Sequence, residues 1–281
     1  MKSLVIFFRV LILSIFLGLS LSLNAQQQAQ TETFIPEVGQ AGKDVVWVPT
    51  PDALVTKMLE MAKVTPEDFL IDLGSGDGRT VIAAAKLGST AIGIEYNPEM
   101  VALSKRNAQE AGVSAKTEFI ETDLFGYDLS KATVITMFLL PEINLKLRPK
   151  ILDLKPGTRI VTNTFTMAEW EPDFEVTTEE NWNSWNSAHM WIVPAKVAGI
   201  WKMDNGELDI RQEFQMFYGT FKTDKNTINI TEGRLNGDLI SFTLGTEKYT
   251  GRVEGNPKMS GDVTSGSDTK KWNATYKGPS E

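Results

Sequence analysis

Three glycines at alternate positions follow an apolar run in the stretch "FLIDLGSGDGRTVIAAAKLG". They are Gly74, Gly76 and Gly78, and the carboxylate of Asp72 precedes them. Glycines between a strand and a helix let backbone amides approach a ligand that a Cβ atom would hold away. The spacing differs from the G-x-G-x-x-G of dinucleotide sites, because Arg79 stands where the third glycine is expected. A carboxylate beside this turn would repel a pyrophosphate, so the residues indicate a ligand that carries positive charge.

Two further carboxylates follow the next predicted strands. Glu95 ends "TAIGIE", 23 residues after Asp72, where a carboxylate can accept hydrogen bonds from both hydroxyls of a ribose. Asp123 follows "TEFIE", where it can accept from the amino group of an adenine while Leu124 packs on the ring. Because neighbouring strands end at one edge of a parallel sheet, these acids predict a site for a cationic nucleoside. S-adenosylmethionine, which carries an ammonium and a sulfonium but no phosphate, fits that description.

The elements that must position these residues alternate between short apolar strands and helices. We predict helices at about 52–64, 77–87, 98–111 and 142–154, and strands at 69–73, 90–95, 117–121, 132–138 and 158–165. This alternation predicts a Rossmann-type α/β fold, a doubly wound and mostly parallel sheet. Two later strands, 173–178 and 189–195, are separated by a tryptophan-rich loop, which predicts an antiparallel pair at one sheet edge.

The sequence from about Lys196 onward alternates with period two and shows no helical period. Turn residues such as Asn236-Gly237 separate the apolar segments. We therefore predict roughly seven or eight strands closed as a small all-β barrel or sandwich. Its large aromatic residues are predicted to form the core, with a lipid-holding cavity as the alternative; they are Trp201, Phe214, Phe242 and Trp272.

The first residues have the pattern of a secretory signal. Lys2 and a long apolar run precede Asn24-Ala25 and a glutamine cluster. We predict a signal peptide at 1–25, a lead-in segment at 26–46, a nucleoside-binding domain at 47–195 and an all-β domain at 196–281. An uncleaved membrane anchor is the alternative, and either one places the remaining chain outside the cytoplasm, in the periplasm or secreted.

Composition excludes several classes of site. The chain has no cysteine and one histidine, which excludes a disulfide framework, a thiolate nucleophile and a cysteine-ligated zinc, and leaves no basis for a metal site or a catalytic triad. Without residues 1–25, 26 basic side chains face 36 acidic ones. That balance argues against nucleic acid as a partner.

Five segments resemble, in order, the five motifs of class I S-adenosylmethionine-dependent methyltransferases: "DLGSGDGR", "GIEYNPEMV", "FIETDLF", "ATVITMFLLPE" and "LKPGTRIVTNTF". In addition, "VPTP" before the glycine turn and F-x-M-x-x-W-x-P-D from Phe165 to Asp173 are similar to two groups of protein-lysine methyltransferases. These are the telomeric-silencing-disruptor type and the mitochondrial enzymes that methylate a component of ATP synthase. The resemblance implies S-adenosylmethionine-dependent N-methylation of a protein lysine or a small amine, here in the cell envelope.

The resemblance also implies roles for matching positions. Asp72 and the three glycines would hold the methionine end of the cofactor, Glu95 the ribose, and Asp123 with Leu124 the adenine. The Thr50 hydroxyl would be a lid contact. The fourth motif reads Phe138 to Glu142 and departs from the D/N-P-P-Y of nucleic-acid amino methylases. Aromatic faces near the methyl acceptor would come from Phe138, Phe165 and Trp170, with Glu142 as a charge partner for an incoming lysine.

Several structural alternatives remain open in the sequence. Asp77 can cap a helix or contact ligand, and Glu142 can be an acid favoured by a helix dipole. The tryptophans 182, 185 and 191 can form an acceptor-site wall or a plug between domains, and His189 is predicted to pack or cap. For the whole chain, the alternative is an exported, non-catalytic nucleoside binder whose β domain contacts an envelope partner.

Overall fold

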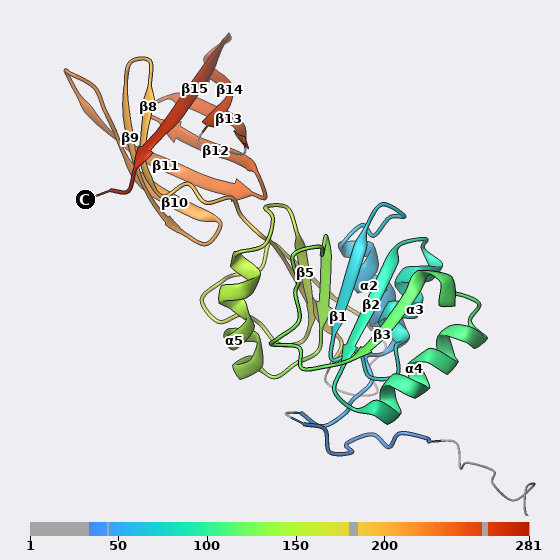
Figure 1. Ribbon diagram of the computed structural model, residues 1–281. Helices are drawn as coiled ribbons and strands as arrows, with labels where there is room; N and C mark the ends of the chain where they lie inside the picture. The colour runs from blue at the N-terminus through green and yellow to red at the C-terminus, as the bar shows by residue number, and fades with distance from the viewer. Residues whose placement is uncertain (1–33, 44, 180–184, 255–257, 281) are drawn as a thin grey trace, which may run out of the picture. The chain divides into compact units, whose positions relative to one another are not determined.

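The structure is a computed structural model that describes residues 34–43, 45–179, 185–254 and 258–280 (Figure 1). By its contacts the chain divides into two units at Pro36, and every element below belongs to Glu37–Glu281. The predicted signal peptide and Trp182 lie outside the described residues.

The first part of this unit is a seven-stranded sheet with helices between the strands. Its order is β3-β2-β1-β4-β5-β7-β6, and the first five strands along the chain pair in parallel while β7 pairs antiparallel with β5 and β6. The predicted doubly wound fold and its antiparallel edge pair are therefore confirmed. The strands are β1 (Phe69–Leu73), β2 (Thr90–Glu95), β3 (Thr117–Glu121), β4 (Val134–Met137), β5 (Arg159–Asn163), β6 (Phe174–Thr177) and β7 (Ser187–Ile192).

Helices cover both faces of the sheet (Figure 1). Successive strand residues point to opposite faces, so Leu70 packs under α2, α3 and α4 while Ile71 belongs to the core beneath α5. Strands buried on both faces explain the continuous apolar runs of the sequence. The helices are α2 (Asp52–Met61), α3 (Arg79–Lys86), α4 (Pro98–Glu110) and α5 (Pro141–Leu152), with a 3₁₀ turn at Ser114–Lys116.

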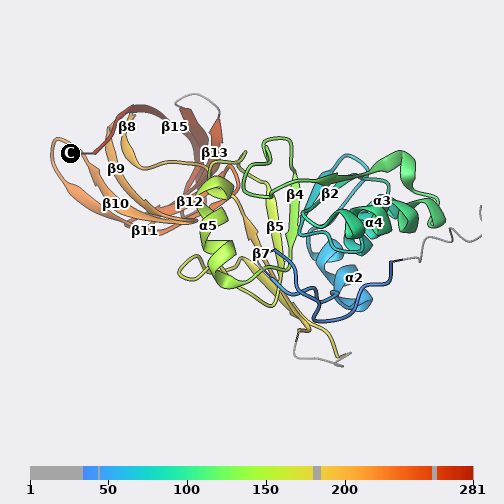
Figure 2. The same ribbon diagram turned by 60° about the horizontal axis from the view of Figure 1, so that its bottom comes forward.

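The second part is a closed antiparallel barrel of eight strands. β8 and β15, its first and last strands, pair with each other and close the wall (Figure 2). The sequence predicted either a barrel or a sandwich. Because β8 pairs with β15, the sheet is closed and the domain is a barrel. The strands are β8 (Gly199–Met203), β9 (Gly206–Glu213), β10 (Met216–Lys222), β11 (Thr227–Asn236), β12 (Leu239–Leu244), β13 (Glu247–Glu254), β14 (Lys258–Ser265) and β15 (Asp268–Gly278).

Aromatic rings fill the barrel interior. Phe242 lies 4.7 Å from Tyr249 and 5.5 Å from Trp272 between ring centroids, and all three side chains are buried. Trp201 is buried as well, as predicted. These contacts support a packed core over the lipid-holding alternative.

Phe214 is a correction to the predicted barrel core. It lies in the turn between β9 and β10, where its ring stacks on Trp170 at 5.8 Å and 11°. The neighbouring Gln215 is buried and donates from Nε2 to the carbonyl of Glu171 at 2.8 Å. Period-two alternation placed Phe214 with the interior residues because the sequence does not show that the strand ends at Glu213.

No helix in the described part of the chain is long and apolar enough to span a membrane.

Candidate active site

A cavity of about 490 Å³ opens where β1, β2 and β4 end. Its volume is in the range of small-molecule sites, and it lies at the switch point where β1 is flanked by β2 and β4. Residues 40–43 and 45–49, which precede α2, form part of the wall. The structure brings most predicted site residues to this cavity, namely Thr50, Asp72, Gly74, Gly76, Glu95, Asp123, Leu124 and Phe138.

Gly76 and Gly78 are each required by close packing, but against different neighbours. Both have positive φ, at 54° and 82°. A Cβ atom on Gly76 would come within 2.7 Å of the Trp47 indole nitrogen, so Trp47 packs directly on the turn. A Cβ atom on Gly78 would collide with Phe119 and Ser104 behind the turn, and Gly78 is not part of the cavity wall. The ligand role predicted for Gly78 is therefore corrected to close packing at the start of α3.

Asp72 is a buried carboxylate in the cavity wall. Only 6% of it is exposed, and Thr136 donates its hydroxyl to Oδ1 at 2.7 Å. Within the described chain it forms no ion pair. Burial, with smaller contributions from the charges of Asp77 and Glu95, raises the pKa of Asp72 to about 7. A cationic group bound beside it would favour the ionised form.

Glu95 is held by the backbone on both sides. Its Oε2 accepts from the amide of Gly76 at 3.0 Å, and its Oε1 accepts from the amides of Tyr96 and Asn97 at 2.9 Å each. These bonds tie the glycine turn to the end of β2 and fix the carboxylate at the cavity. An acceptor fixed in this way is suited to a pair of neighbouring hydroxyls.

Asp123 is paired with a residue that the sequence did not point to. Lys43 Nζ donates to Oδ2 at 2.7 Å and lies 4.6 Å from the centre of the Tyr96 ring. The hydrogen bonds from Lys43 and from the Phe125 amide lower the pKa of Asp123. Lys43 lies 80 residues away along the chain, and no local pattern connects the two positions. An adenine amino group would compete with Lys43 for this carboxylate.

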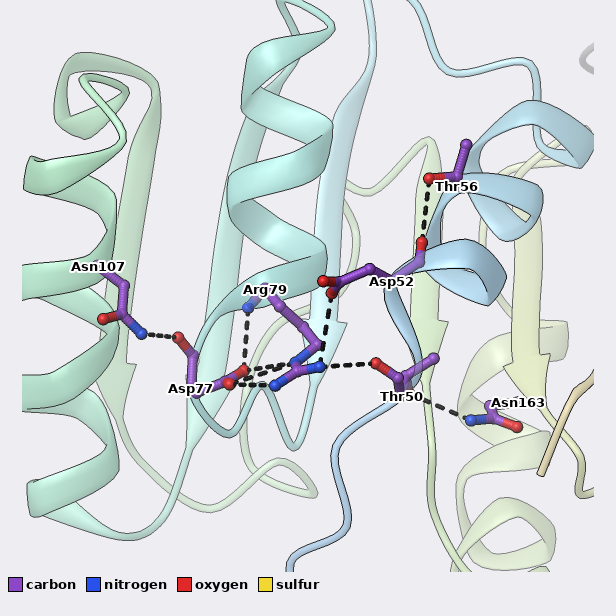
Figure 3. A network of polar contacts seen from close by, with 7 residues as sticks. All are labelled: Thr50, Asp52, Thr56, Asp77, Arg79, Asn107 and Asn163. Atoms are coloured by element: carbon purple, nitrogen blue, oxygen red, sulfur yellow. Dashed lines mark hydrogen bonds and ion pairs between the residues drawn. The ribbon is translucent and has the colours of Figure 1, made fainter. Parts of the chain in front are cut away.

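Asp77 caps α3 and binds a side chain (Figure 3). Its Oδ1 accepts from the amide of Arg79, the first residue of α3, at 3.3 Å, and Asp77 is also part of the cavity wall. Its carboxylate binds the guanidinium of Arg79, with Nε at 3.0 Å and Nη2 at 2.6 Å. Arg79 also donates from Nη1 to the carbonyl of Thr50 at 3.0 Å. Asp77 and Arg79 therefore fasten the glycine turn to the segment that leads into α2.

Aromatic side chains line the cavity beyond β4. The rings of Phe138 and Phe165 stack with centroids 5.9 Å apart, and Trp185 meets Phe138 edge-on at 5.5 Å. All three belong to the cavity wall. Trp185 lies in this wall, whereas Trp191 is fully buried and packs on Trp170, whose ring in turn stacks on Phe214.

Two predicted acceptor-side residues lie elsewhere. Trp170 is fully buried, stacks on Phe214, and accepts at its carbonyl from the Trp191 indole at 2.6 Å. Glu142 is exposed in the first turn of α5 and is not part of the cavity wall. The aromatic role of Trp170 is therefore wrong, and Glu142 has the position of an acid that a helix dipole favours.

The residues of the cavity fit a cationic nucleoside. The cationic side chains of the cavity wall, Lys43 and Arg79, are both paired with carboxylates. Asp72 and Glu95 form no ion pair within the described chain. Ser75 Oγ is buried in the same wall, with no hydrogen-bond partner among the described residues. The cavity therefore offers a ligand carboxylates and the Ser75 hydroxyl, which can donate or accept a hydrogen bond, next to an apolar and aromatic wall.

Comparisons with known proteins agree with this geometry. A family model described as the ANTKMT methyltransferase domain matches residues 72–174. A protein-lysine N-methyltransferase of Saccharolobus islandicus is 40% identical over 152 residues, which are 53% of this chain and 94% of that protein. The human lysine N-methyltransferase of the ATP synthase C protein is 38% identical over 120 residues, 42% of this chain and 50% of that protein.

One solved structure is similar over the same part of the chain. It is described as an RNA methyltransferase from Salinibacter ruber in complex with S-adenosyl-L-homocysteine. The identity is 45%, the TM-score is 0.50, and the match covers 53% of this chain and 96% of that one. The match spans about half of this chain, as does that with the archaeal protein.

Proposed function

The chain belongs to the S-adenosylmethionine-dependent protein-lysine N-methyltransferases, and we propose that it methylates lysine side chains of a protein, or the amine of a small molecule, in the cell envelope. The observation that carries this proposal is the cavity itself. One cavity is lined both by strand-end carboxylates, which suit a cationic nucleoside, and by aromatic rings, which suit the aliphatic stem of a lysine.

Each part of the cofactor has residues that would hold it. When bound, S-adenosylmethionine supplies a methyl group on a positively charged sulfur. Asp123 would accept from the adenine amino group once Lys43 releases it, and the fixed carboxylate of Glu95 would accept from the ribose hydroxyls. The buried carboxylate of Asp72 would lie near the ammonium and gain from its charge.

The aromatic wall would orient and desolvate the acceptor. Methyl transfer needs an uncharged amine in line with the methyl carbon, so positioning supplies most of the rate. Phe138, Phe165 and Trp185 would pack along the aliphatic stem of a lysine. Burial of an ammonium among apolar rings disfavours its charged form and thereby helps release the proton before transfer.

The proposed location rests on residues 1–25 alone. A charged start, an apolar run and the small residue Ala25 are typical of an export signal. Immunodetection in cell fractions tests the proposal: a protein shortened by about 25 residues is expected in the envelope or medium. Full-length protein confined to the cytoplasm would contradict it.

Transfer from labelled S-adenosylmethionine tests the acceptor class. Purified protein is incubated with envelope proteins, with the same proteins after chemical blocking of their lysines, with small amines, and with total RNA. Label in the unblocked proteins or the amines, lost from the blocked proteins, is expected. Label in RNA alone would contradict the proposal, and the acidic balance of the chain argues against that result.

A further inference from the structure

We infer that His189 is a positioning residue for the acceptor side of the cavity: as an imidazolium it holds the peptide group that orients the Phe165 ring, and the neutral ring releases that group. His189 lies in β7 and is not part of the cavity wall, so it acts through the turn at Thr164. The inference rests on the proposed function, because Phe165 belongs to the aromatic wall proposed to hold the acceptor amine.

His189 is the middle residue of a row that crosses three strands at the edge of the sheet. Glu175 of β6 and Thr162 of β5 are its direct partners in the two antiparallel pairs, and directly opposed side chains lie on one face of a sheet. Thr162 Oγ1 donates to the carbonyl of Phe165 at 2.6 Å. His189 Nε2 lies 3.1 Å from the carbonyl oxygen of Thr164. The row therefore engages two successive carbonyls of the turn that follows β5.

The peptide group between Thr164 and Phe165 is held at both ends. Its N–H donates to the carbonyl of Asn163 at 2.6 Å, and its carbonyl oxygen faces the His189 ring. Thr164 has a φ of +60°, which is unusual for a β-branched residue and persists only where neighbouring groups hold it. Among the described residues, His189 is the only partner of the Thr164 carbonyl. The plane of this peptide group sets the direction of the Phe165 side chain, whose ring stacks on Phe138.

Both ring nitrogens of His189 face groups that accept hydrogen bonds. Nδ1 lies 3.1 Å from Oε1 of Glu175, and an exposed carboxylate is ionised at neutral pH and only accepts. Nε2 faces the carbonyl of Thr164, which also only accepts. A neutral imidazole carries one N–H and can serve one of the two acceptors, whereas an imidazolium donates to both. The two contacts together therefore require the protonated ring.

Loss of one ring proton is expected to break the contact with Thr164 and to keep the one with Glu175. A hydrogen bond to a charged acceptor is stronger than one to a neutral acceptor, so the remaining proton stays on Nδ1. Nε2 then presents its lone pair to the carbonyl oxygen of Thr164, and the two repel each other. The peptide group is released on that side, while the bond from Thr162 to the next carbonyl remains.

No other charged side chain of the described residues forms an ion pair or hydrogen bond with His189. β6 (Phe174–Thr177) presents Glu175 as its one charged residue, His189 is the only titratable residue of β7, and turn residues 164–167 are uncharged. The charged residues of the neighbouring elements are bound elsewhere, exposed, or on α2, which packs on the opposite face of the sheet: Arg159 binds Asp68, Arg148 binds Glu169, Arg234 binds Asp173, Lys150 donates to the carbonyls of Phe125 and Tyr127, Glu142 and Lys146 are exposed, and Asp52, Lys57 and Glu60 belong to α2.

Nitrogen NMR of the ring measures the proton positions. The sequence contains one histidine, so the whole protein, with no histidine added, gives one pair of ring-nitrogen signals. At about pH 5 both nitrogens are expected to carry a proton, and at about pH 9 only Nδ1 is expected to carry one. Glu175→Ala removes the acceptor of Nδ1, so its neutral ring is expected to carry the proton on Nε2 instead.

The Phe165 amide reports whether the turn follows the ring. Its resonance is expected to change with the same midpoint as the His189 ring, because this amide and the Thr164 carbonyl belong to one peptide group. In His189→Gln, the longer side chain places an amide donor near the position of Nε2, and this donor does not titrate. The Phe165 resonance should then stay constant across the same pH range. His189→Asn is the matched control, because its shorter side chain places the amide near the position of Nδ1.

The initial rate of label transfer to unblocked envelope proteins measures the consequence for the reaction. At about pH 6, His189→Asn is expected to lower this rate about 3- to 10-fold and His189→Gln less than about twofold, the range of one neutral hydrogen bond. Affinity for S-adenosylhomocysteine should change less than about twofold in both, since His189 is not part of the cavity wall. The ratio of the unsubstituted rate to the His189→Gln rate cancels the ionisation of the amine. It is expected to fall about 3- to 10-fold between about pH 5 and about pH 9.

Three results would overturn the inference: a proton on Nε2 of the unsubstituted protein at about pH 9, a Phe165 amide that does not follow the ring, or equal rates in His189→Asn and His189→Gln. Where His189→Asn does not fold, the rate ratio replaces it, and a ratio that is constant with pH would overturn the inference. The NMR measurements contain neither acceptor nor cofactor. Absence of lysine methylation with both NMR results as expected would therefore contradict the proposed acceptor and leave the role of His189 in the turn standing.

Discussion

The barrel and the cofactor cavity use buried residues in opposite ways. In the barrel, buried aromatic rings contact one another, and the Trp272 indole donates to the carbonyl of Thr250 at 3.0 Å. In the cavity wall, the Asp72 carboxylate is buried without a cation, and Ser75 Oγ without a hydrogen-bond partner, among the described residues. Thr164, next to the wall residue Phe165, has a φ of +60°. The barrel residues stabilise the fold, whereas the cavity residues carry unfavourable free energy that a ligand can relieve.

The largest expected effect lies in the barrel. Trp272→Ala removes a buried ring that contacts Phe242 and Tyr249, so the free energy of unfolding should fall by about 3–5 kcal/mol. Chemical denaturation measures this loss. Affinity for S-adenosylhomocysteine, measured on the folded fraction, should not change.

Tyr218→Ala is the matched control on the outside of the barrel. Its side chain is 54% exposed, so the loss should stay within about 1 kcal/mol. A similar loss in both variants, or a change of ligand affinity in Trp272→Ala, would break the distinction between the two regions.

Asp72→Asn should lower ligand affinity without lowering stability, the reverse of what is expected for Trp272→Ala. Loss of a buried carboxylate beside the ligand ammonium is expected to weaken the binding of S-adenosylhomocysteine by about 1.5–3 kcal/mol, which raises its dissociation constant by a factor of about 10 to 100. Without ligand, the variant should unfold at a higher temperature than the unsubstituted protein at pH 8, since an uncharged amide replaces a desolvated charge. Calorimetry and thermal scans test both halves, with the exposed Asp204→Asn as a control.

The pH dependence of stability also tests whether the Asp72 carboxylate is desolvated. Asp72 has a pKa of about 7 in the folded chain and 3.8 as the reference value for an unfolded one. Between these values the folded state keeps a proton that the unfolded state has released, so the stability from Asp72 is complete below about pH 4 and is lost as pH rises to about 7.

Relative to Asp72→Asn, the unsubstituted protein should lose up to about 1.4 kcal/mol per pH unit across that window. Denaturation curves of both proteins at several pH values measure the difference. A constant difference from pH 4 to pH 8 would show that Asp72 is not desolvated.

The smallest effect is expected where the barrel contacts Trp170, in the core next to the sheet. Phe214→Leu keeps an apolar side chain on Trp170 but removes the stacked ring pair, which should cost about 0.5–1.5 kcal/mol of unfolding free energy. Denaturant titration gives the value. Ligand affinity should be unchanged, and a clear loss of affinity would show that the barrel contact reaches the cavity.

Local sequence pattern was sufficient for the positions of the strand-end acids. Asp72 and Glu95 lie in the last two residues of recognisable apolar strands and Asp123 just after one, and the order of a parallel sheet brings such ends to one edge. Their ligand roles remain predictions, as does the division of the chain into domains. The sheet, its antiparallel edge pair and the all-β character of the C-terminal part also followed from periodicity.

What the sequence missed depends on contacts between distant segments. Lys43 reaches Asp123 from a segment without regular structure, and Asn163 reaches Thr50 from 113 residues away. Trp185 and Trp191 belong to one tryptophan-rich stretch, yet Trp191 is in the core and Trp185 in the cavity wall. Residue type does not separate these roles, because large aromatic rings suit both environments.

The crystal structure of the complex with S-adenosylhomocysteine tests the central claim most directly. We expect the adenine amino group to bind Asp123 with Lys43 displaced, the ribose hydroxyls to bind Glu95, and the amino-acid end to lie between Asp72 and the Thr50 hydroxyl. A nucleoside bound elsewhere, or a cavity that stays empty at saturating ligand while Asp72 and Glu95 keep their present partners, would contradict it.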